Sequence, residues 1–311
     1  MGDGRDRGDG ASVTVTVPHQ SRPLGWVLVA IGWPLRLVVI LLLLAEHLHT
    51  TLRSVGTIGL AVFAASFVLP VPLYFLAAWT RRRGRRHLTV ALVEDELGEG
   101  PFVLYLRSFS DDPQRARLAP SLLAAIGGPA RSLLSDEEQL AHSVRWFGPM
   151  VAVGRPRERL PYAGASRVYL PDTGWRETVV RLMSTTQLLL VGLGPGEQLR
   201  WELEQAAVHV PPQRIILLVP YDENAYAELR EAVRARGALP QPLPAVPPPK
   251  RRRRYRYGIR GAVHFDADWA PQFVSFATAY PHPGRRITYS FLTRFSEKFG
   301  ELGRSPRGKE H

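Results

Sequence analysis

The stretch LLLVGLGPGEQLRWELEQAAVH, residues 188–209, joins an apolar run, a glycine-rich turn and an amphipathic segment in direct succession. The apolar run Leu188–Val191 is short and bounded by turn residues, which is typical of a buried strand. The turn GLGPGE leads into a helix predicted over Glu197–His209, where it either binds an anion or simply starts the helix. Its spacing matches neither GxGxxG nor a P-loop. A strand followed at once by a helix is the repeating unit of an α/β fold.

The same alternation continues on both sides of this stretch. Four further strands are predicted, at Phe102–Leu106, Met150–Val153, Ile215–Val219 and Ala262–Phe265. The further helices are predicted at Leu118–Ile126, from a Ser135-x-x-Glu138 capping box to Trp146, from Thr173 or Gly174 onward, and over Glu223–Arg236 before Gly237. Five strands alternating with helices predict an α/β domain over residues 87–266, with a five-stranded parallel sheet covered on both faces.

Two segments do not fit this alternation. Residues 239–257 form a Pro/Arg-rich insertion, and its six prolines in ten residues predict an extended surface excursion. The basic run that follows is either a solvated loop, a contact with the anionic inner leaflet or, with Tyr255 and Tyr257, a nucleic-acid contact. In the C-terminal segment 267–311, an apolar residue at every fourth position predicts a closing helix, docked on the domain or lying on the membrane surface. The residues of this repeat are Ile287, Phe291, Phe295 and Phe299.

Two long apolar stretches, Leu24–Ala45 and Val55–Trp79, follow a polar lead of residues 1–23 that is expected to be disordered. Each stretch has the roughly 20 apolar residues that a helix needs to cross a bilayer core. We therefore predict a two-helix transmembrane hairpin, with its basic flank, over residues 24–86. Arg36 lies in the first stretch and is expected to be tolerated there.

The basic charge is concentrated in two runs. Forty Lys and Arg residues against 28 Asp and Glu residues give a net charge of +12. The loop predicted over Glu46–Ser54 carries one arginine, whereas five arginines follow Trp79, so the positive-inside rule places both chain termini in the cytoplasm. The chain is thus expected to be a multi-pass cell-membrane protein in contact with the bilayer and its anionic headgroups. The residues expected at the membrane surface are Arg81, Arg82, Arg83, Arg85, Arg86, Arg251, Arg252, Arg253 and Arg254.

The composition argues against several classes of protein. The absence of cysteine removes disulfides, thiol nucleophiles and cysteine-ligated metals. Glu46, His47 and His49 lie in the predicted loop and are not expected to bind a metal. Two local basic patches, rather than a diffuse basic surface, argue against nucleic acid as a partner. Two helices with one buried charge do not readily line a transport path. The abundance of Arg, Gly and Pro is typical of GC-rich bacterial coding.

Four segments, taken in order, resemble a Toll/interleukin receptor (TIR)-like domain. They are FVLYLRSFSDD (102–112), VAVGRP (151–156), GASRVYL (164–170) and LLLVGLGPGEQLRWELEQA (188–206). The third of these resembles the loop after the family's second strand. The resemblance covers roughly residues 100–266 and implies a flavodoxin-like fold with a role in signalling or self-association. It implies no cofactor.

Some TIR-like proteins cleave NAD with one glutamate on the third helix. Carried over, the family's Glu-Leu pair falls on Glu202 and Leu203, with Glu204 as the alternative carboxylate; NAD would then be a substrate. The family usually has its tryptophan four residues before the glutamate, whereas Trp201 directly precedes it here. A carboxylate in a partly dry cleft could stabilise the charge that develops at the ribose. The alternative is that both glutamates are surface or salt-bridged residues. The ligand-binding residues expected at this edge of the sheet are Arg107, Ser108, Asp111, Gly194, Gly196 and Trp201.

Overall fold

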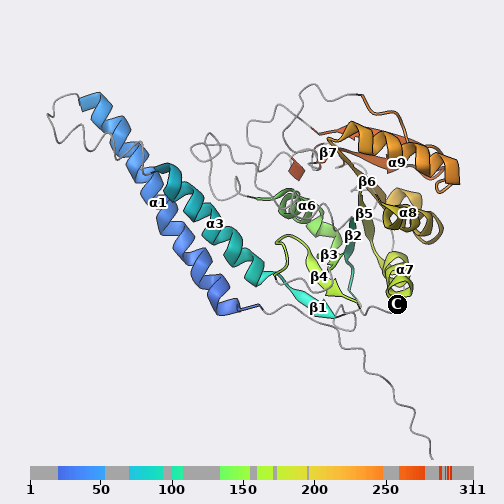
Figure 1. Ribbon diagram of the computed structural model, residues 1–311, viewed down its shortest axis with the longest axis horizontal. Helices are drawn as coiled ribbons and strands as arrows, with labels where there is room; N and C mark the ends of the chain where they lie inside the picture. Colours follow the sequence, from blue (N-terminus) through green and yellow to red (C-terminus); the bar gives the residue numbers. More distant parts are fainter. Residues whose placement is uncertain are drawn as a thin grey trace, which may run out of the picture.

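The computed structural model describes residues 20–52, 70–93, 100–107, 134–154, 160–170, 174–194, 196–247, 259–276, 287–288, 291, 293 and 295. These residues form an α/β domain from which two helices, α1 (Arg22–Leu52) and α3 (Pro70–Leu88), project side by side (Figure 1). Leu118–Ile126, Phe299, the lead 1–19 and the arginines at 251–254 lie outside the described residues.

Eight strands of the described residues form one sheet in the order β1-β4-β3-β2-β5-β6-β7-β8. The strands are β1 (Ala91–Val93), β2 (Val103–Arg107), β3 (Met150–Val153), β4 (Ser166–Tyr169), β5 (Leu188–Gly192), β6 (Ile215–Pro220), β7 (Ile259–Phe265) and β8 (Pro271–Ser275). The neighbours from β1 to β6 pair in parallel, while β7 pairs antiparallel with both β6 and β8. The sheet is therefore mostly parallel, as the sequence predicts.

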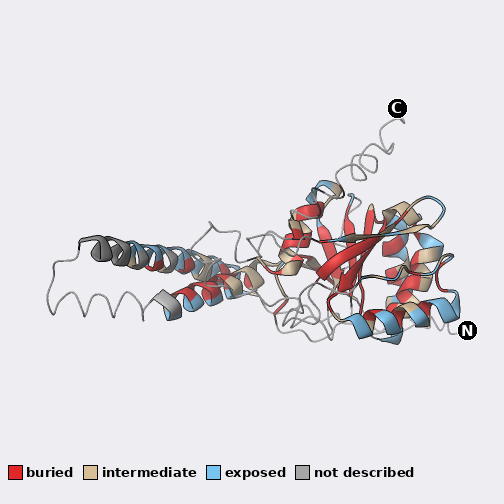
Figure 2. Ribbon diagram, turned by 90° about the horizontal axis from the view of Figure 1, so that it is seen from above, coloured by how far each residue is buried: buried red, intermediate tan, exposed pale blue. Residues whose placement is uncertain are grey.

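Helices cover both faces of this sheet, which is why its central strands are apolar on both sides. The helices of the domain are α6 (Asp136–Val144), α7 (Trp175–Thr185), α8 (Glu197–His209) and α9 (Glu223–Arg236), with 3-10 turns η4 (Arg145–Phe147) and η5 (Pro212–Arg214). Buried side chains of α7, α8 and α9 pack on one face of the sheet. Those of α6, together with Ile287, Phe291 and Phe295, pack on the other. Figure 2 shows the buried residues concentrated in the sheet and on the helix sides that face it.

The predicted five-stranded parallel sheet needs three corrections. First, β1, β4 and β8 were not predicted as strands, and GASRVYL, interpreted as a loop, contains β4. Second, the predicted fifth strand, now β7, runs antiparallel. Third, residues 239–247 do not form the predicted surface excursion: Leu239 and Leu243 are buried in the core, and the Tyr226 hydroxyl donates to the Pro244 carbonyl at 2.9 Å. Strands as short as these, with three to five residues, carry little periodicity, and a proline-rich chain can bury apolar side chains without regular structure.

The end signals of the helices were predicted well, because capping is a local interaction. Ser135 accepts a hydrogen bond from the Glu138 backbone N–H, and the Glu138 carboxylate accepts one from the Ser135 N–H, so the capping box is formed. Gly237 ends α9 in a left-handed conformation with φ of 61°. The apolar stripe also docks as predicted, since Ile287, Phe291 and Phe295 are fully buried against the domain.

The two N-terminal helices differ from the predicted hairpin. Within the described residues one segment, Arg22–Leu42 of α1, is long and apolar enough to span a membrane. The helix continues to Leu52, so most of the predicted loop Glu46–Ser54 is helical. Of the second predicted stretch, only residues 70–79 are described, and they begin α3. A two-span membrane hairpin is therefore not established, although α1 and α3 pack together closely: a Cβ added to Gly84 would lie 2.6 Å from the Gly25 carbonyl oxygen.

Candidate functional site

The order of the strands reverses between β2 and β5. From β2 the chain goes to β3 on one side, and from β5 it goes to β6 on the other. Arg107 and Gly192, the last residues of these two strands, are partners in the register. Ligands of open α/β sheets bind outside the carboxyl ends of the strands at such a reversal. A ligand site of this sheet is therefore expected at the carboxyl ends of β2 and β5.

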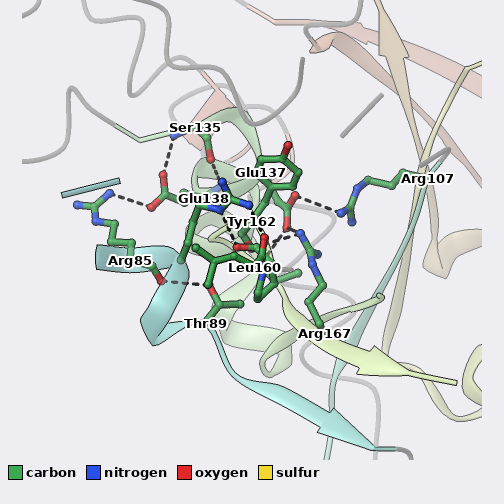
Figure 3. A network of polar contacts seen from close by, with 12 residues as sticks. Arg85, Thr89, Arg107, Ser135, Glu137, Glu138, Leu160, Tyr162 and Arg167 are labelled. Carbon is green, nitrogen blue, oxygen red and sulfur yellow. Dashed lines mark hydrogen bonds and ion pairs between the residues drawn. The ribbon is translucent and has the colours of Figure 1, made fainter. Parts of the chain in front are cut away.

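A buried cluster of charged side chains lies below this edge, on the face covered by α6 (Figure 3). The Glu137 carboxylate lies 2.8 Å from Arg167 Nη2 and 3.7 Å from Arg107 Nη2. It also accepts the Ala165 backbone N–H at 3.1 Å. All three charged side chains are at most 3% exposed. This buried carboxylate joins α6 to β2 and β4 and holds the three elements in one arrangement. Moving it away would leave two buried guanidinium charges uncompensated.

Arg167 is the least satisfied member of this cluster. Its Nη2 donates to the Tyr162 carbonyl at 3.3 Å, while Nε and Nη1 make no hydrogen bond within the part of the chain that the structure describes. Nothing in the sequence pointed to Glu137 or Arg167 as members of a site. The capping box located α6, but only the tertiary structure brings Glu137 to strands that lie elsewhere in the chain.

The two candidate catalytic glutamates have different environments. The Glu202 side chain is buried on the sheet side of α8 and accepts a hydrogen bond from Gln198 Nε2 at 3.0 Å. Burial raises the pKa of Glu202 to about 7, and the Gln198 hydrogen bond lowers it by less. Glu204 is more exposed and lies 3.9 Å from Arg236 of α9. Of the two, Glu202 is the desolvated carboxyl, and its raised pKa lies in the range that suits an acid or base near neutral pH.

Aromatic residues lie on the outer side of the same helix. The rings of Trp201 and Trp175 meet edge to face at 5.4 Å, and the Arg176 guanidinium lies 5.2 Å from the centroid of the Trp201 ring. Both tryptophans are half-buried at the contact of α7 with α8. This geometry assigns Trp201 a packing role between α7 and α8, for which no ligand is needed.

The other expected ligand-binding residues are not gathered around Glu202. Arg107 faces α6 and its guanidinium lies 5.2 Å from the Tyr105 ring, whereas α8 packs on the opposite face of the sheet. Gly194 is buried, and Gly196 is exposed with φ of 125°, where it precedes α8. Ser108 and Asp111 lie outside the described residues. The side chains of Arg107 and Glu202 are therefore separated by the sheet.

The basic flank of α3 is used largely within the chain. Arg81 is buried against α1, with its guanidinium 4.9 Å from the Trp33 ring centroid. Arg85 pairs with Glu138 at 2.8 Å, and Arg86 donates to the carbonyls of Leu160 and Pro161. Arg82 is half-buried and Arg83 is exposed. Of the five arginines of α3 that were expected at the membrane surface, Arg85 and Arg86 instead dock the helix on the domain.

The described residues contain no group of three or more His, Asp or Glu side chains that could hold a metal ion. The chain has no significant match to a protein-family model, a curated protein or a solved structure.

Proposed function

We propose that this chain is a membrane-anchored protein whose α/β domain acts as a signalling or self-association module at the cytosolic face. The observation that carries the proposal is the direct junction between helix and sheet. α3 ends at Leu88 and β1 begins at Ala91 as an edge strand, paired with β4. Because only two residues separate them, a movement of the helix is transmitted to the sheet.

Side-chain contacts reinforce this junction. The Arg85–Glu138 ion pair joins α3 to the first turn of α6. Arg86 bonds to two backbone carbonyls of the segment before β4, and its guanidinium lies 4.5 Å from the centroid of the Tyr162 ring. Gln20, before α1, donates to the carbonyls of Arg86 and Thr89. A domain meant only to be tethered would be served by a flexible linker, whereas these contacts favour a unit that moves with its helices.

The TIR-like identity of the domain rests on the sequence resemblance. It is supported by the order of the five strands that the sequence predicted, which is the 2-1-3-4-5 order of flavodoxin-like folds. The antiparallel β7 and the three additional strands, β1 and β4 beyond β3 and β8 beyond β7, depart from a purely parallel five-stranded sheet. We therefore propose that the domain is a flavodoxin-like core with extra strands added on both sides.

The anchoring proposal is tested on the full chain expressed in bacterial cells. Alkaline carbonate extraction should leave the protein in the membrane pellet, because an apolar helix is held by the bilayer core. A reporter that is active only in the cytosol, fused after His311, should be active, and one that requires the extracytoplasmic space should be silent. Release by carbonate would overturn the anchoring, and the opposite reporter result would overturn the orientation.

A second function, NAD cleavage at Glu202, is favoured by one observation. Glu202 is the buried member of the two glutamates, and its raised pKa suits an acid or base near neutral pH. The reaction itself, cleavage of NAD, is inferred from the resemblance to TIR-like proteins. Arg107 would have no part in it, because its side chain faces α6.

This second function is tested by incubating the detergent-solubilised full chain with NAD, alone and clustered by an antibody against a tag, and measuring nicotinamide release. Glu202→Gln should lower turnover by about 100-fold or more, since a positioned acid or base contributes that much. Glu204→Gln should retain activity. The absence of release from the clustered wild-type chain would reject the enzyme and leave the scaffold function.

A further inference from the structure

α1 is longer than a bilayer core is thick, so one of its ends must lie outside the hydrocarbon. Its helix runs from Arg22 to Leu52, so at 1.5 Å per residue it is roughly 46 Å long. A bilayer core is only about 30 Å thick. About a third of α1 therefore cannot lie in hydrocarbon. Hydropathy alone selects Arg22–Leu42 as the crossing segment and leaves the C-terminal end outside.

The packing of α3 against α1 indicates instead that the N-terminal end of α1 lies outside the hydrocarbon core. Gly25 lies against Gly84, and a Cβ added to Gly32 would meet the Arg81 side chain. The first third of α1 thus runs beside the basic end of α3, in antiparallel register. Farther along, Val39 packs with Tyr74 and Ala78, which belong to the apolar start of α3. Immersing residues 22–32 in hydrocarbon would immerse the arginines of α3 as well.

The cost of immersing arginine in hydrocarbon favours keeping the N-terminal end of α1 outside the bilayer core. On insertion scales, one arginine at the centre of the bilayer costs roughly six times what one leucine or valine gains there. Residues 22–32 offer five Leu, Val and Ile side chains against five arginines in the neighbouring turns of α3, whereas residues 43–52, which would replace them in the core, hold one glutamate and two histidines. Arg85 and Arg86 also contact the domain itself, which lies outside the bilayer. The charged end of the helix pair is thus kept out of the hydrocarbon core.

We propose that α1 enters the hydrocarbon core at Trp33 rather than at Leu24, and that residues 22–32 lie at the level of the lipid headgroups. This inference rests on the membrane anchoring proposed above. Trp33 of α1 and Trp79 of α3 are both more than half exposed, as residues of an interfacial aromatic belt are, and the Trp33 ring lies next to the Arg81 guanidinium. Residues 33–52 then span roughly 30 Å, which matches the core thickness, and the polar residues Glu46, His47 and His49 lie in the last two turns, near its far boundary.

Two features of the chain are explained by this boundary. The exposed apolar side chains of the first third of α1, Leu24, Trp26, Val27 and Ile31, face the headgroup and upper acyl region, where apolar helix faces are stable. The backbone of Arg36 lies only about 4.5 Å inside the boundary. It is therefore not at the centre of the bilayer, where an arginine costs most.

The absence of cysteine makes this boundary directly measurable. Single-cysteine variants of the full chain at four exposed positions, Val27→Cys, Ile31→Cys, Leu37→Cys and Leu41→Cys, are treated with a water-soluble maleimide in open membrane sheets, where both faces are accessible. The thiolate is the reactive form and needs water, so the first two should label on the order of tenfold faster than the last two. All four should label in sodium dodecyl sulfate, which shows that each thiol is reactive.

The outcomes separate the boundary from the anchoring. Protection of all four positions in a chain that resists carbonate extraction would overturn the boundary at Trp33 and leave the anchoring intact. Rapid labelling of all four, with release by carbonate, would overturn the anchoring. Rapid labelling at Leu37 and Leu41 in a chain that stays in the membrane would place the boundary deeper in α1 and would also reject the proposal.

Discussion

Replacing Glu202 by glutamine should change how the stability of the domain depends on pH. Burial raises the pKa of this carboxyl from 4.5 to about 7 in the folded protein. Between these values the folded state holds a proton that the unfolded state releases, so the free energy of unfolding falls as pH rises. The stabilisation is fully present below pH 4.5 and is lost as pH passes 7. A change from 4.5 to about 7, at 1.36 kcal/mol per pH unit, corresponds to about 3 kcal/mol.

The assay is urea unfolding of the detergent-solubilised full chain, followed by tryptophan fluorescence, at several pH values between about 4.5 and 8. Wild type should lose about 3 kcal/mol relative to Glu202→Gln across this range, because glutamine does not titrate. Taking the difference between the two proteins cancels the titration of all other groups. Glu204→Gln, on the more exposed side of the same helix, is the matched control and should follow wild type. Parallel curves for wild type and Glu202→Gln would refute the reasoning and show that Glu202 is well solvated.

Two further substitutions test the cluster and the helix pair. Glu137→Gln should cost about 3–5 kcal/mol in the free energy of unfolding, because it leaves two buried guanidinium groups without their shared counter-charge; Glu231→Gln, in an exposed pair, should leave the unfolding curve unchanged. Gly84→Ala should force α1 and α3 apart, since the added Cβ would lie 2.6 Å from the backbone of Gly25. A fall in protease resistance of the helix pair measures this separation, and Gly100→Ala, with open space around its Cβ, should retain full resistance.

The predicted strands succeeded where the signal was a continuous apolar run. β5 and β6 are buried on both faces, so nearly every residue in them is aliphatic and the run stands out from the polar chain around it. β4 was missed because Ser166 and Arg167 interrupt the apolar pattern. Arg167 is buried all the same, because a carboxylate from α6 compensates its charge. A local pattern cannot represent that compensation.

The sequence by itself determined the α/β class, the helix ends and the presence of an apolar helix near the N-terminus, since each depends on residues within a few positions of one another. Only the tertiary structure decided the antiparallel direction of β7, the separation of Arg107 from Glu202 by the sheet, and the joining of Glu137 to two strands. It also decided which arginines of α3 dock on the domain and which part of α1 runs beside them. These properties depend on pairs of residues far apart in the chain, and the free energy that selects each pairing comes from burial and charge compensation between them.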